Sequence, residues 1–342
     1  MRALVLRKMG EIVLEERETP TPGEGEVLIR IVATGICGSD VHGYTGANGR
    51  RVPGQIMGHE AAGTIAALGP GTEGGGLAVG RPATFNPVVV PAEDASAYAG
   101  REQHHPGKYI IGVAPEISAA FADFVLVPAR NVVPLPEDMP IERGALIEPL
   151  AVALHAVRRV RAAEHSRVLV VGGGPIGQSV VLALRLEGVA TVFVSEVDPA
   201  RRALCERLGA TAMDPEAGSI LGFLEANGGR VPVALDAVGI SVTVADALNA
   251  TEFGGSVCLV GMGAPRLDLD AYRVSTEERT IVGSFTYSAA DFRDAAALVA
   301  AGGDEIGELI SREVAPEDAD AAFRALAGRD GTAGKVLSLI HI

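Results

Sequence analysis

Cysteine is scarce in this sequence, which holds only Cys37, Cys205 and Cys258 among 342 residues. An odd number of thiols cannot form a complete set of disulfides, so the composition argues against a disulfide framework and favours a reducing, cytoplasmic setting. Positive charge is also scarce, with 29 basic residues against 43 acidic ones and a formal net charge of −14. Nucleic acids and anionic membranes bind basic patches, so we expect neither as a partner.

Long apolar runs and targeting signals are absent as well. No stretch approaches the roughly 18 to 20 apolar residues that a membrane-spanning helix needs. Residues 1–16 mix apolar and charged side chains and lack the apolar core of a signal peptide. We therefore expect a chain that neither crosses a membrane nor carries a leader.

The chain is rich in the components of a large core. It is 48% hydrophobic and contains 43 glycines, a composition that suits an α/β protein with many tight turns. A length of 342 residues exceeds a typical single domain, so we expect two domains.

The pattern of the sequence changes near residue 141. Before it, strand-like segments separated by proline and glycine predict mainly β-structure, at residues 2–6, 26–33, 63–68 and 122–127. After it, strands alternate with helices: strands at 167–171, 190–195, 232–236 and 256–260, and helices at 148–160, 176–186 and 200–208. This alternation predicts a doubly wound parallel sheet over residues 146–282. Residues 283–342 return to a mixed pattern, with helices expected at 289–301 and 317–326.

A glycine-rich turn follows the first predicted strand of this alternating region. Residues 172–177 read Gly-Gly-Gly-Pro-Ile-Gly and fit G-x-G-x-x-G. Such a string is weak alone, but here it joins a strand to a helix, and an acidic residue, Glu196, ends the next strand. Gly172 would permit the turn, Gly174 would let backbone approach a pyrophosphate, and Gly177 would let helix and strand pack closely.

The acidic residue bears on which dinucleotide is bound. Glu196 would hydrogen-bond a ribose diol and repel a 2′-phosphate, which favours NAD over NADP. Arg201 and Arg202 lie a few residues farther on and leave NADP open, because either could reach a 2′-phosphate; the alternative is that both are solvated helix cations.

A second set of residues has the chemistry of metal ligands. Cys37, His59, Glu60 and Glu148 offer the thiolate, imidazole and carboxylate donors that zinc accepts. Taken singly they mean little, because a lone cysteine is usually a small buried residue and a lone glutamate is usually solvated. Zinc beside a dinucleotide site indicates alcohol oxidation.

The sequence resembles the zinc-dependent medium-chain alcohol dehydrogenases, of the sorbitol (polyol) dehydrogenase type, over essentially its whole length. The resemblance rests on residues 35–42, 58–63, 121–128, 146–150 and 281–285. It implies a mostly-β GroES-like catalytic domain, made of residues 1–145 and 283–342, beside a Rossmann dinucleotide-binding domain at 146–282.

The resemblance assigns roles to the metal-ligand candidates. It makes Cys37 and His59 direct ligands of one catalytic zinc, and in the polyol branch it adds Glu60. Glu148 would ligate directly or through water, and this stays open. Asp40 would orient the site from outside the ligand set, although a turn-capping aspartate is an equal alternative.

The resemblance also implies an activity, in which hydride passes from a secondary alcohol, such as a polyol or sugar alcohol, to NAD. Zinc would act as a Lewis acid on the hydroxyl, Ser39 would take its proton, and His42 would pass the proton to water. The alternatives are a threonine- or butanediol-type or other secondary-alcohol dehydrogenase, which could use NADP, and a non-catalytic relative. We place in the cofactor site Gly172, Gly174, Pro175, Ile176, Gly177, Glu196, Arg201, Val238, Gly261 and Ser284.

One departure from the family concerns a second metal. Many relatives hold a structural zinc with four cysteines, but the corresponding slots here hold Pro91, Asp94, Ala97 and His105. We therefore expect no structural zinc and interpret His104 and His105 as solvated loop histidines. The resemblance further implies a homodimer or homotetramer that acts on a small molecule.

Overall fold

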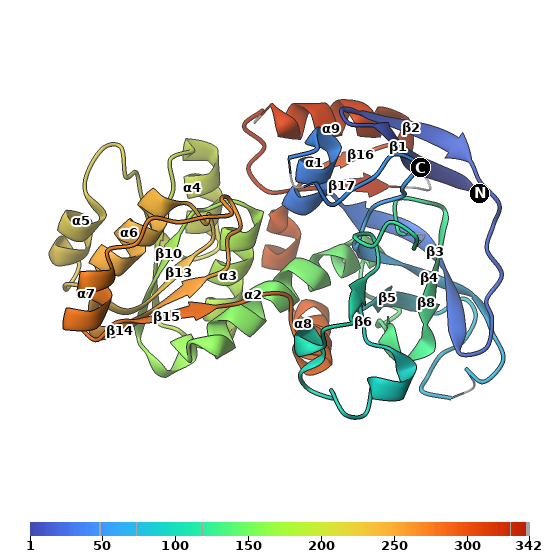
Figure 1. The fold of residues 1–342 in the computed structure, drawn as a ribbon, viewed down its shortest axis with the longest axis horizontal. Helices are drawn as coiled ribbons and strands as arrows, with labels where there is room; N and C mark the ends of the chain where they lie inside the picture. Colours follow the sequence, from blue (N-terminus) through green and yellow to red (C-terminus); the bar gives the residue numbers. More distant parts are fainter. Residues whose placement is uncertain (48, 73, 118, 329, 340–342) are drawn as a thin grey trace. The chain divides into compact units, whose positions relative to one another are not determined.

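The computed structural model of the protein describes residues 1–47, 49–72, 74–117, 119–328 and 330–339. The chain divides into two compact units (Figure 1). Unit 1 comprises Met1–Glu148 and Tyr287–Ile342, and unit 2 comprises Pro149–Thr286.

Unit 1 is built on a seven-stranded sheet with the order β16-β17-β3-β4-β5-β9, in which β8 also pairs with β3. Its strands are β3 (Glu26–Gly35), β4 (Glu60–Leu68), β5 (Pro82–Phe85), β8 (Phe124–Pro128), β9 (Val132–Pro134), β16 (Ile310–Val314) and β17 (Lys335–Leu339). β3 and β4 are antiparallel, and their register sets Gly35 opposite Glu60. The pairing therefore brings the chain after β3 to the beginning of β4.

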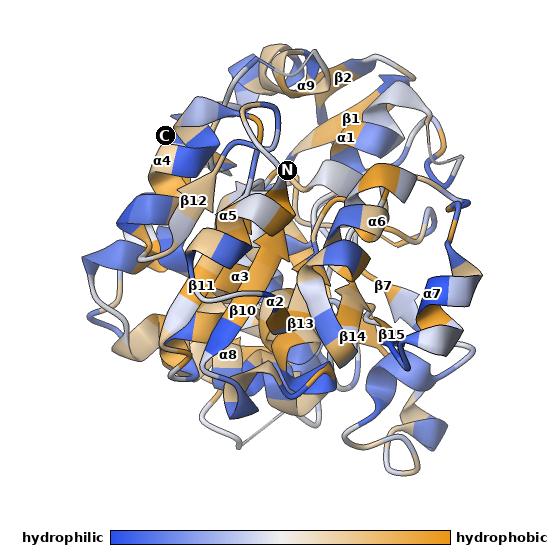
Figure 2. Cartoon of the chain, turned by 90° about the vertical axis from the view of Figure 1, so that its left-hand side faces the viewer, coloured by the Kyte–Doolittle hydropathy of each residue, from blue (hydrophilic) through white to orange (hydrophobic). Residues whose placement is uncertain are grey.

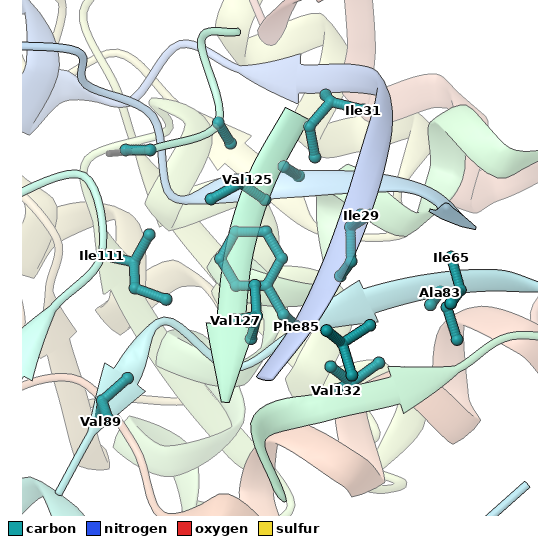
Figure 3. Packing of buried hydrophobic residues seen from close by; sticks show 14 residues of the cluster. Ile29, Ile31, Ile65, Ala83, Phe85, Val89, Ile111, Val125, Val127 and Val132 are labelled. Carbon is teal, nitrogen blue, oxygen red and sulfur yellow. The ribbon is translucent and has the colours of Figure 1, made fainter. Parts of the chain in front are cut away.

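A buried apolar cluster holds this sheet in place (Figure 3). Ile29 on β3, Phe85 on β5 and Val125 on β8 are each at most 1% exposed and belong to one cluster. Burying a side chain of this size contributes about 1.5–3 kcal/mol. The strand ends that carry the candidate site are therefore anchored by a rigid core.

Unit 1 also contains two short pairings and several helices. β1 (Arg2–Lys8) pairs with β2 (Glu11–Glu16), and β6 (Val88–Val89) pairs with β7 (Tyr109–Ile110). The helices are α1 (Gly38–Thr45), α8 (Ala289–Ala301) and α9 (Ala319–Ala327), and α2 (Ile147–Arg159) begins at the end of the first segment. A 3₁₀ turn at Pro316–Asp318 precedes α9, so proline opens this helix region as expected.

Unit 2 is a parallel sheet with the order β12-β11-β10-β13-β14-β15. Its strands are β10 (Arg167–Val171), β11 (Thr191–Ser195), β12 (Thr211–Met213), β13 (Val231–Asp236), β14 (Thr251–Leu259) and β15 (Thr280–Gly283). The strand order runs outward in both directions from the neighbours β10 and β13, which Figure 2 shows in the colours of hydrophobic residues. This is the doubly wound order with its switch point between β10 and β13.

Helices connect the strands of unit 2. They are α3 (Pro175–Leu186), α4 (Pro199–Arg207), α5 (Ile220–Ala226), α6 (Ser241–Ala250) and α7 (Ala271–Thr276). The predicted parallel sheet is present, and the strand expected at 256–260 begins earlier, at Thr251. Within the described ranges, no helix combines the length and apolar character needed to cross a membrane.

Candidate metal centre and dinucleotide site

Three of the four predicted metal ligands meet in unit 1. The donor atoms of Cys37, His59 and Glu60 all lie within 4.8 Å of one another. Cys37 caps the N-terminus of α1, which follows β3, and His59 and Glu60 stand where β4 begins. The β3–β4 register explains the meeting, because Glu60 lies opposite Gly35, two residues before Cys37.

Two glycines make this approach possible. Gly58 has φ of 97°, and a β-carbon there would lie 2.8 Å from the backbone nitrogen of Phe121. A β-carbon at Gly35 would lie 2.2 Å from Oε2 of Glu60. Any side chain at either position would therefore displace the ligands.

The fourth predicted ligand, Glu148, is held by a tyrosine. Glu148 is 8% exposed in the first turn of α2, and its Oε1 accepts a hydrogen bond of 2.8 Å from the hydroxyl of Tyr287. Burial raises the pKa of Glu148 to about 7, although the nearby His59 opposes the rise. Glu148 is not a member of the trio whose donor atoms lie within 4.8 Å.

Glu60 forms a buried ion pair with a lysine at the start of β17. Nζ of Lys335 lies 2.8 Å from Oε1 of Glu60, and both side chains are at most 4% exposed. Burial acts to lower the pKa of Lys335, but Glu60 and Cys37 outweigh it and raise the pKa above its usual value. Oε2 of Glu60 is buried and has no hydrogen-bond partner in the part of the chain that the structure describes.

Asp40 contacts two members of the trio. Its Oδ2 accepts a hydrogen bond from the backbone nitrogen of Cys37 at 3.2 Å, and its Oδ1 lies 3.6 Å from Nδ1 of His59. The guanidinium of Arg51, with a side chain 1% exposed, approaches the same Oδ1 to 3.3 Å. Because Nδ1 of His59 faces Asp40, its other ring nitrogen is left for a metal.

The electrostatics of this cluster suit a divalent cation. Burial acts to lower the pKa of His59, but Asp40 and Cys37 hold it well above its usual value. Asp40, Cys37 and Glu148 all act to raise the pKa of His59, so the cluster attracts positive charge. The S, N and O donors and the unpartnered Oε2 of Glu60 therefore fit a zinc ion.

Three of these partners were missed by the sequence analysis: Arg51, Tyr287 and Lys335. The signal for Lys335 was a single lysine at the beginning of an apolar strand, which must be paired if it is buried. The signal for Tyr287 was its position just before Ser288 and Asp291, which form a capping box at the start of α8. Arg51 carries no signal of this kind.

The predicted proton-transfer residues lie on α1. Ser39 is partly buried and His42 is exposed at the last turn of the helix. Residues three apart on a helix share a face, so Ser39 and His42 lie on the same face of α1, with Ser39 nearer the end of the helix that Cys37 caps.

In unit 2, the glycine turn has the geometry predicted for it. Gly172 has φ of 95°, which permits the turn after β10. A β-carbon at Gly177 would lie 1.8 Å from the carbonyl oxygen of Gly172, so α3 packs directly on the end of the strand. Gly174 caps α3, and Pro175 begins it.

Glu196 is fixed beside this turn. Its Oε2 accepts a hydrogen bond of 2.6 Å from the backbone nitrogen of Gly173, and its Oε1 accepts one of 2.8 Å from that of Asp198. The remaining lone pairs of both oxygens are available to a ribose diol.

The two arginines on α4 differ in their contacts. Arg202 donates to the carbonyl oxygens of Glu196 and Val197 and forms an ion pair of 3.0 Å with Asp214. Nε of Arg201 is buried without a hydrogen-bond partner among the residues described, and its Nη1 lies 3.8 Å from where a β-carbon of Gly174 would be. Arg201 is therefore the arginine whose side chain adjoins the turn.

The other predicted cofactor residues all follow the carboxyl ends of parallel strands. Val238 follows β13, Gly261 follows β14 and Ser284 follows β15. Val238 also packs over the turn, because a β-carbon at Gly172 would lie 2.4 Å from its Cγ2. Ligands of doubly wound sheets bind at this edge.

The segment at residues 86–112 corrects one prediction. His105 is only 6% exposed, so its interpretation as a solvated histidine was wrong, whereas His104 is exposed. Nε2 of His105 lies 3.0 Å from Oδ2 of Asp94, and its ring meets that of Tyr98 edge-on at 4.4 Å. Residues at two of the four expected cysteine slots, positions 94 and 105, are thus joined by a hydrogen bond.

Comparison with known proteins identifies the family. The alcohol dehydrogenase GroES-like domain matches residues 23–137, and the zinc-binding dehydrogenase family matches residues 175–301. L-galactonate-5-dehydrogenase of Escherichia coli (strain K12) is 32% identical over 88% of this chain and 88% of that protein. The chain belongs to the zinc-binding alcohol dehydrogenase family.

Further relatives of this zinc-binding alcohol dehydrogenase agree. Sorbitol dehydrogenase of Ovis aries is 32% identical over 83% of this chain and 82% of that protein. 2R,3R-butanediol dehydrogenase from Bacillus subtilis is 27% identical, with a TM-score of 0.89 and 99% of each chain covered. A zinc-binding dehydrogenase from Sinorhizobium meliloti 1021, solved bound to NADP, is 30% identical, with a TM-score of 0.89 and 99% of each chain covered.

These findings confirm the predicted family and the predicted fold class, a GroES-like domain with a Rossmann-type parallel sheet. The protein is an oxidoreductase of the zinc-dependent secondary-alcohol class, and its cofactors are zinc and a nicotinamide dinucleotide. Its substrate is a small molecule.

Proposed function

We propose that this dehydrogenase transfers hydride from a secondary hydroxyl of a polyol, sugar alcohol or related compound to NAD. The trio Cys37, His59 and Glu60, with Glu148 in the same unit, is the observation that carries the proposal. The named relatives that act on sorbitol and L-galactonate support the polyol class.

In this proposal unit 1 is the zinc-binding catalytic domain and unit 2 the dinucleotide-binding domain. The corresponding boundaries in the sequence are residues 1–145 with 283–342, and residues 146–282. The metal candidates belong to unit 1 and the glycine turn belongs to unit 2, which supports this division.

One zinc per chain would be held by Cys37, His59 and Glu60, with Glu148 either direct or through water. When bound, zinc supplies Lewis acidity that lowers the pKa of the substrate hydroxyl. No structural zinc is proposed, because proline and alanine at positions 91 and 97 cannot ligate a metal through their side chains.

The chain's own residues would move the proton. Ser39 would accept it from the substrate hydroxyl, and His42 would release it to water. The partly buried serine and the exposed histidine on one face of α1 support this order, because an imidazole titrates near physiological pH.

NAD is the proposed dinucleotide. The carboxylate of Glu196 is fixed beside the turn at Gly173 and would repel the negative charge of a 2′-phosphate. Arg201 would contact the ribose or a phosphate. The NADP-bound relative and the free Nε of Arg201 make an NADP-linked enzyme the alternative.

A butanediol- or threonine-type secondary-alcohol dehydrogenase is the second candidate, and the structural likeness to butanediol dehydrogenase favours it. A non-catalytic protein on the same fold is a remote third, because Cys37, His59, Ser39 and His42 are all present.

We also propose a homodimer or homotetramer in the cytoplasm. β15 ends the sheet of unit 2, and several large apolar side chains of the same region are exposed, namely Phe253, Met262, Leu269, Tyr272 and Phe285. An edge strand with exposed apolar residues nearby in the sequence favours pairing with a second copy. The three free cysteines agree with a reducing compartment.

The test is turnover of NAD with polyols, secondary alcohols and threonine, with and without a zinc chelator. Chelator-sensitive reduction on one group of substrates is expected. Cys37→Ser should abolish turnover while NAD still binds, and Cys258→Ser, a buried cysteine on β14, should leave both unchanged. Turnover near wild type in Cys37→Ser would disprove the zinc assignment.

Cofactor preference has its own test. Glu196→Ala should erode the preference for NAD over NADP, measured as the ratio of kcat/KM for the two dinucleotides. An unchanged ratio would remove Glu196 from its proposed role.

A further inference from the structure

Tyr287 is fully buried and lies against the predicted metal centre. Its hydroxyl donates to Oε1 of Glu148 at 2.8 Å. No hydrogen bond from Tyr287 to another member of the centre is present in the described chain. The tyrosine therefore acts on the centre through Glu148.

The beginning of α8 fixes the ring of Tyr287. Ser288 is the N-cap of this helix and forms a capping box with Asp291. Tyr287 is the residue before the cap, and its ring packs on that of Phe292, with ring centroids 5.5 Å apart. This is a hydrophobic staple, which sets the angle at which the chain enters a helix. The position of the hydroxyl is thus set by the helix start.

The two glutamates of the centre are held in different ways. Lys335 pairs with Oε1 of Glu60, and Oε2 has no hydrogen-bond partner among the described residues. A donor atom of Glu60 lies within 4.8 Å of those of Cys37 and His59. Glu148 falls outside that group. Three candidate donors therefore lie close together, and the fourth, the carboxylate of Glu148, lies outside this group.

We propose that Tyr287 is a positioning residue that holds Glu148 back from the metal, so that the site keeps three protein ligands and one open position. Four protein ligands would make a closed shell of the structural kind, whereas a catalytic zinc needs a position for water or substrate. This inference rests on the proposed zinc site, and it selects Glu60 as the carboxylate that ligates directly.

The test replaces the hydroxyl alone, in Tyr287→Phe. The freed Glu148 should join the metal, so zinc should bind more tightly while kcat falls about 10- to 100-fold. Zinc affinity is measured on the metal-free protein by competition with a chromophoric chelator. In the cobalt(II)-substituted protein, added imidazole should change the visible spectrum of the wild type and leave that of Tyr287→Phe unchanged.

Two controls separate this effect from structural damage. Tyr44→Phe removes the hydroxyl of another buried tyrosine, which donates to the carbonyl oxygen of Gly10, and should preserve zinc affinity and the imidazole response. Glu148→Gln added to Tyr287→Phe should restore the imidazole response, because an amide ligates weakly. If Tyr287→Phe fails to fold, Phe292→Leu, which loosens the ring, should tighten zinc binding by a smaller factor.

Weaker or unchanged zinc affinity in the variant, or an imidazole response like that of the wild type, would overturn the proposal while leaving the zinc site intact. Wild-type protein that binds no zinc would overturn both this inference and the proposed function.

Discussion

Replacing Lys335 with methionine tests whether Glu60 is a metal ligand. Methionine keeps most of the volume of the side chain and removes its charge. The change leaves the carboxylate of Glu60, which is fully buried, without its partner at 2.8 Å.

The magnitude follows from the burial of the pair. At an effective dielectric constant of about 20, two charges 2.8 Å apart attract by roughly 6 kcal/mol before desolvation is subtracted. Removing one partner of a buried ion pair typically costs about 3–5 kcal/mol. In a folding unit of about 200 residues this corresponds to a decrease in Tm of roughly 10 °C.

The destabilisation should depend on the metal. A bound zinc ion supplies the positive charge that Lys335 no longer provides, so the loss should be full in metal-free Lys335→Met and much smaller in the zinc-loaded variant. The assay is urea unfolding of wild type and variant, each with zinc and after removal of zinc by a chelator. The zinc-induced gain in the free energy of unfolding should be greater in the variant by about 2 kcal/mol or more.

An equal loss of stability with and without zinc would refute this reasoning. It would mean that Glu60 makes no contact with the metal, and Glu148 would then be the stronger candidate. The control is Lys108→Met, the same substitution in the 86–112 segment, far from Lys335 in the sequence. Its effect on the free energy of unfolding should be the same with and without zinc.

Three further predictions concern other parts of the molecule. The pKa of Glu148 is raised from 4.5 to about 7, so its protonated form favours folding below pH 4.5 and this contribution disappears as the pH rises through 7. Metal-free Glu148→Gln should therefore exceed wild type in stability at pH 8 by up to about 3 kcal/mol and match it at pH 4, measured by urea unfolding; equal stability at both pH values would contradict this. His105→Ala should lose the hydrogen bond with Asp94, about 1–2 kcal/mol, and limited proteolysis should cut residues 86–112 faster while NAD binding persists. An unchanged cleavage rate would count against it. Gly177→Ala would place a β-carbon 1.8 Å from the carbonyl oxygen of Gly172. Titration calorimetry should therefore show that NAD binding is lost, while the zinc content stays unchanged. If NAD still binds with wild-type affinity, the close packing of Gly177 on Gly172 is not required for NAD binding.

The outline of unit 2 could be predicted from the sequence because its signals are local. A buried parallel strand appears as a short apolar run, as in residues 167–171, and a glycine turn followed by proline marks where the next helix begins. Glu196 could be selected as the candidate for contact with the ribose because it stands at the end of the following strand, β11. The short strands β12 and β15 were not predicted, because three or four residues carry too little periodicity.

The candidate metal ligands could be selected by motif, but the residues that contact them could not. Cys37 and His59 stand in short segments with a characteristic spacing, whereas Lys335 lies 275 residues from the glutamate that it pairs with. Nothing along the chain relates two such positions until β17 pairs with β3 and β3 pairs with β4. His105 was misread for the same reason, because its burial depends on how the 86–112 segment folds around Asp94 and Tyr98.

The order of residues along the chain therefore establishes which groups are available: a thiol, an imidazole, carboxylates and a glycine turn, in an arrangement that identifies the family. How each group is held depends on contacts between distant segments. Cys37, His59 and Glu60 converge because antiparallel pairing sets two strand ends side by side, while the staple of α8 brings Tyr287 to Glu148. Burial then fixes the consequences, since a charge removed from water must find a partner, and that partner comes from wherever the fold places one.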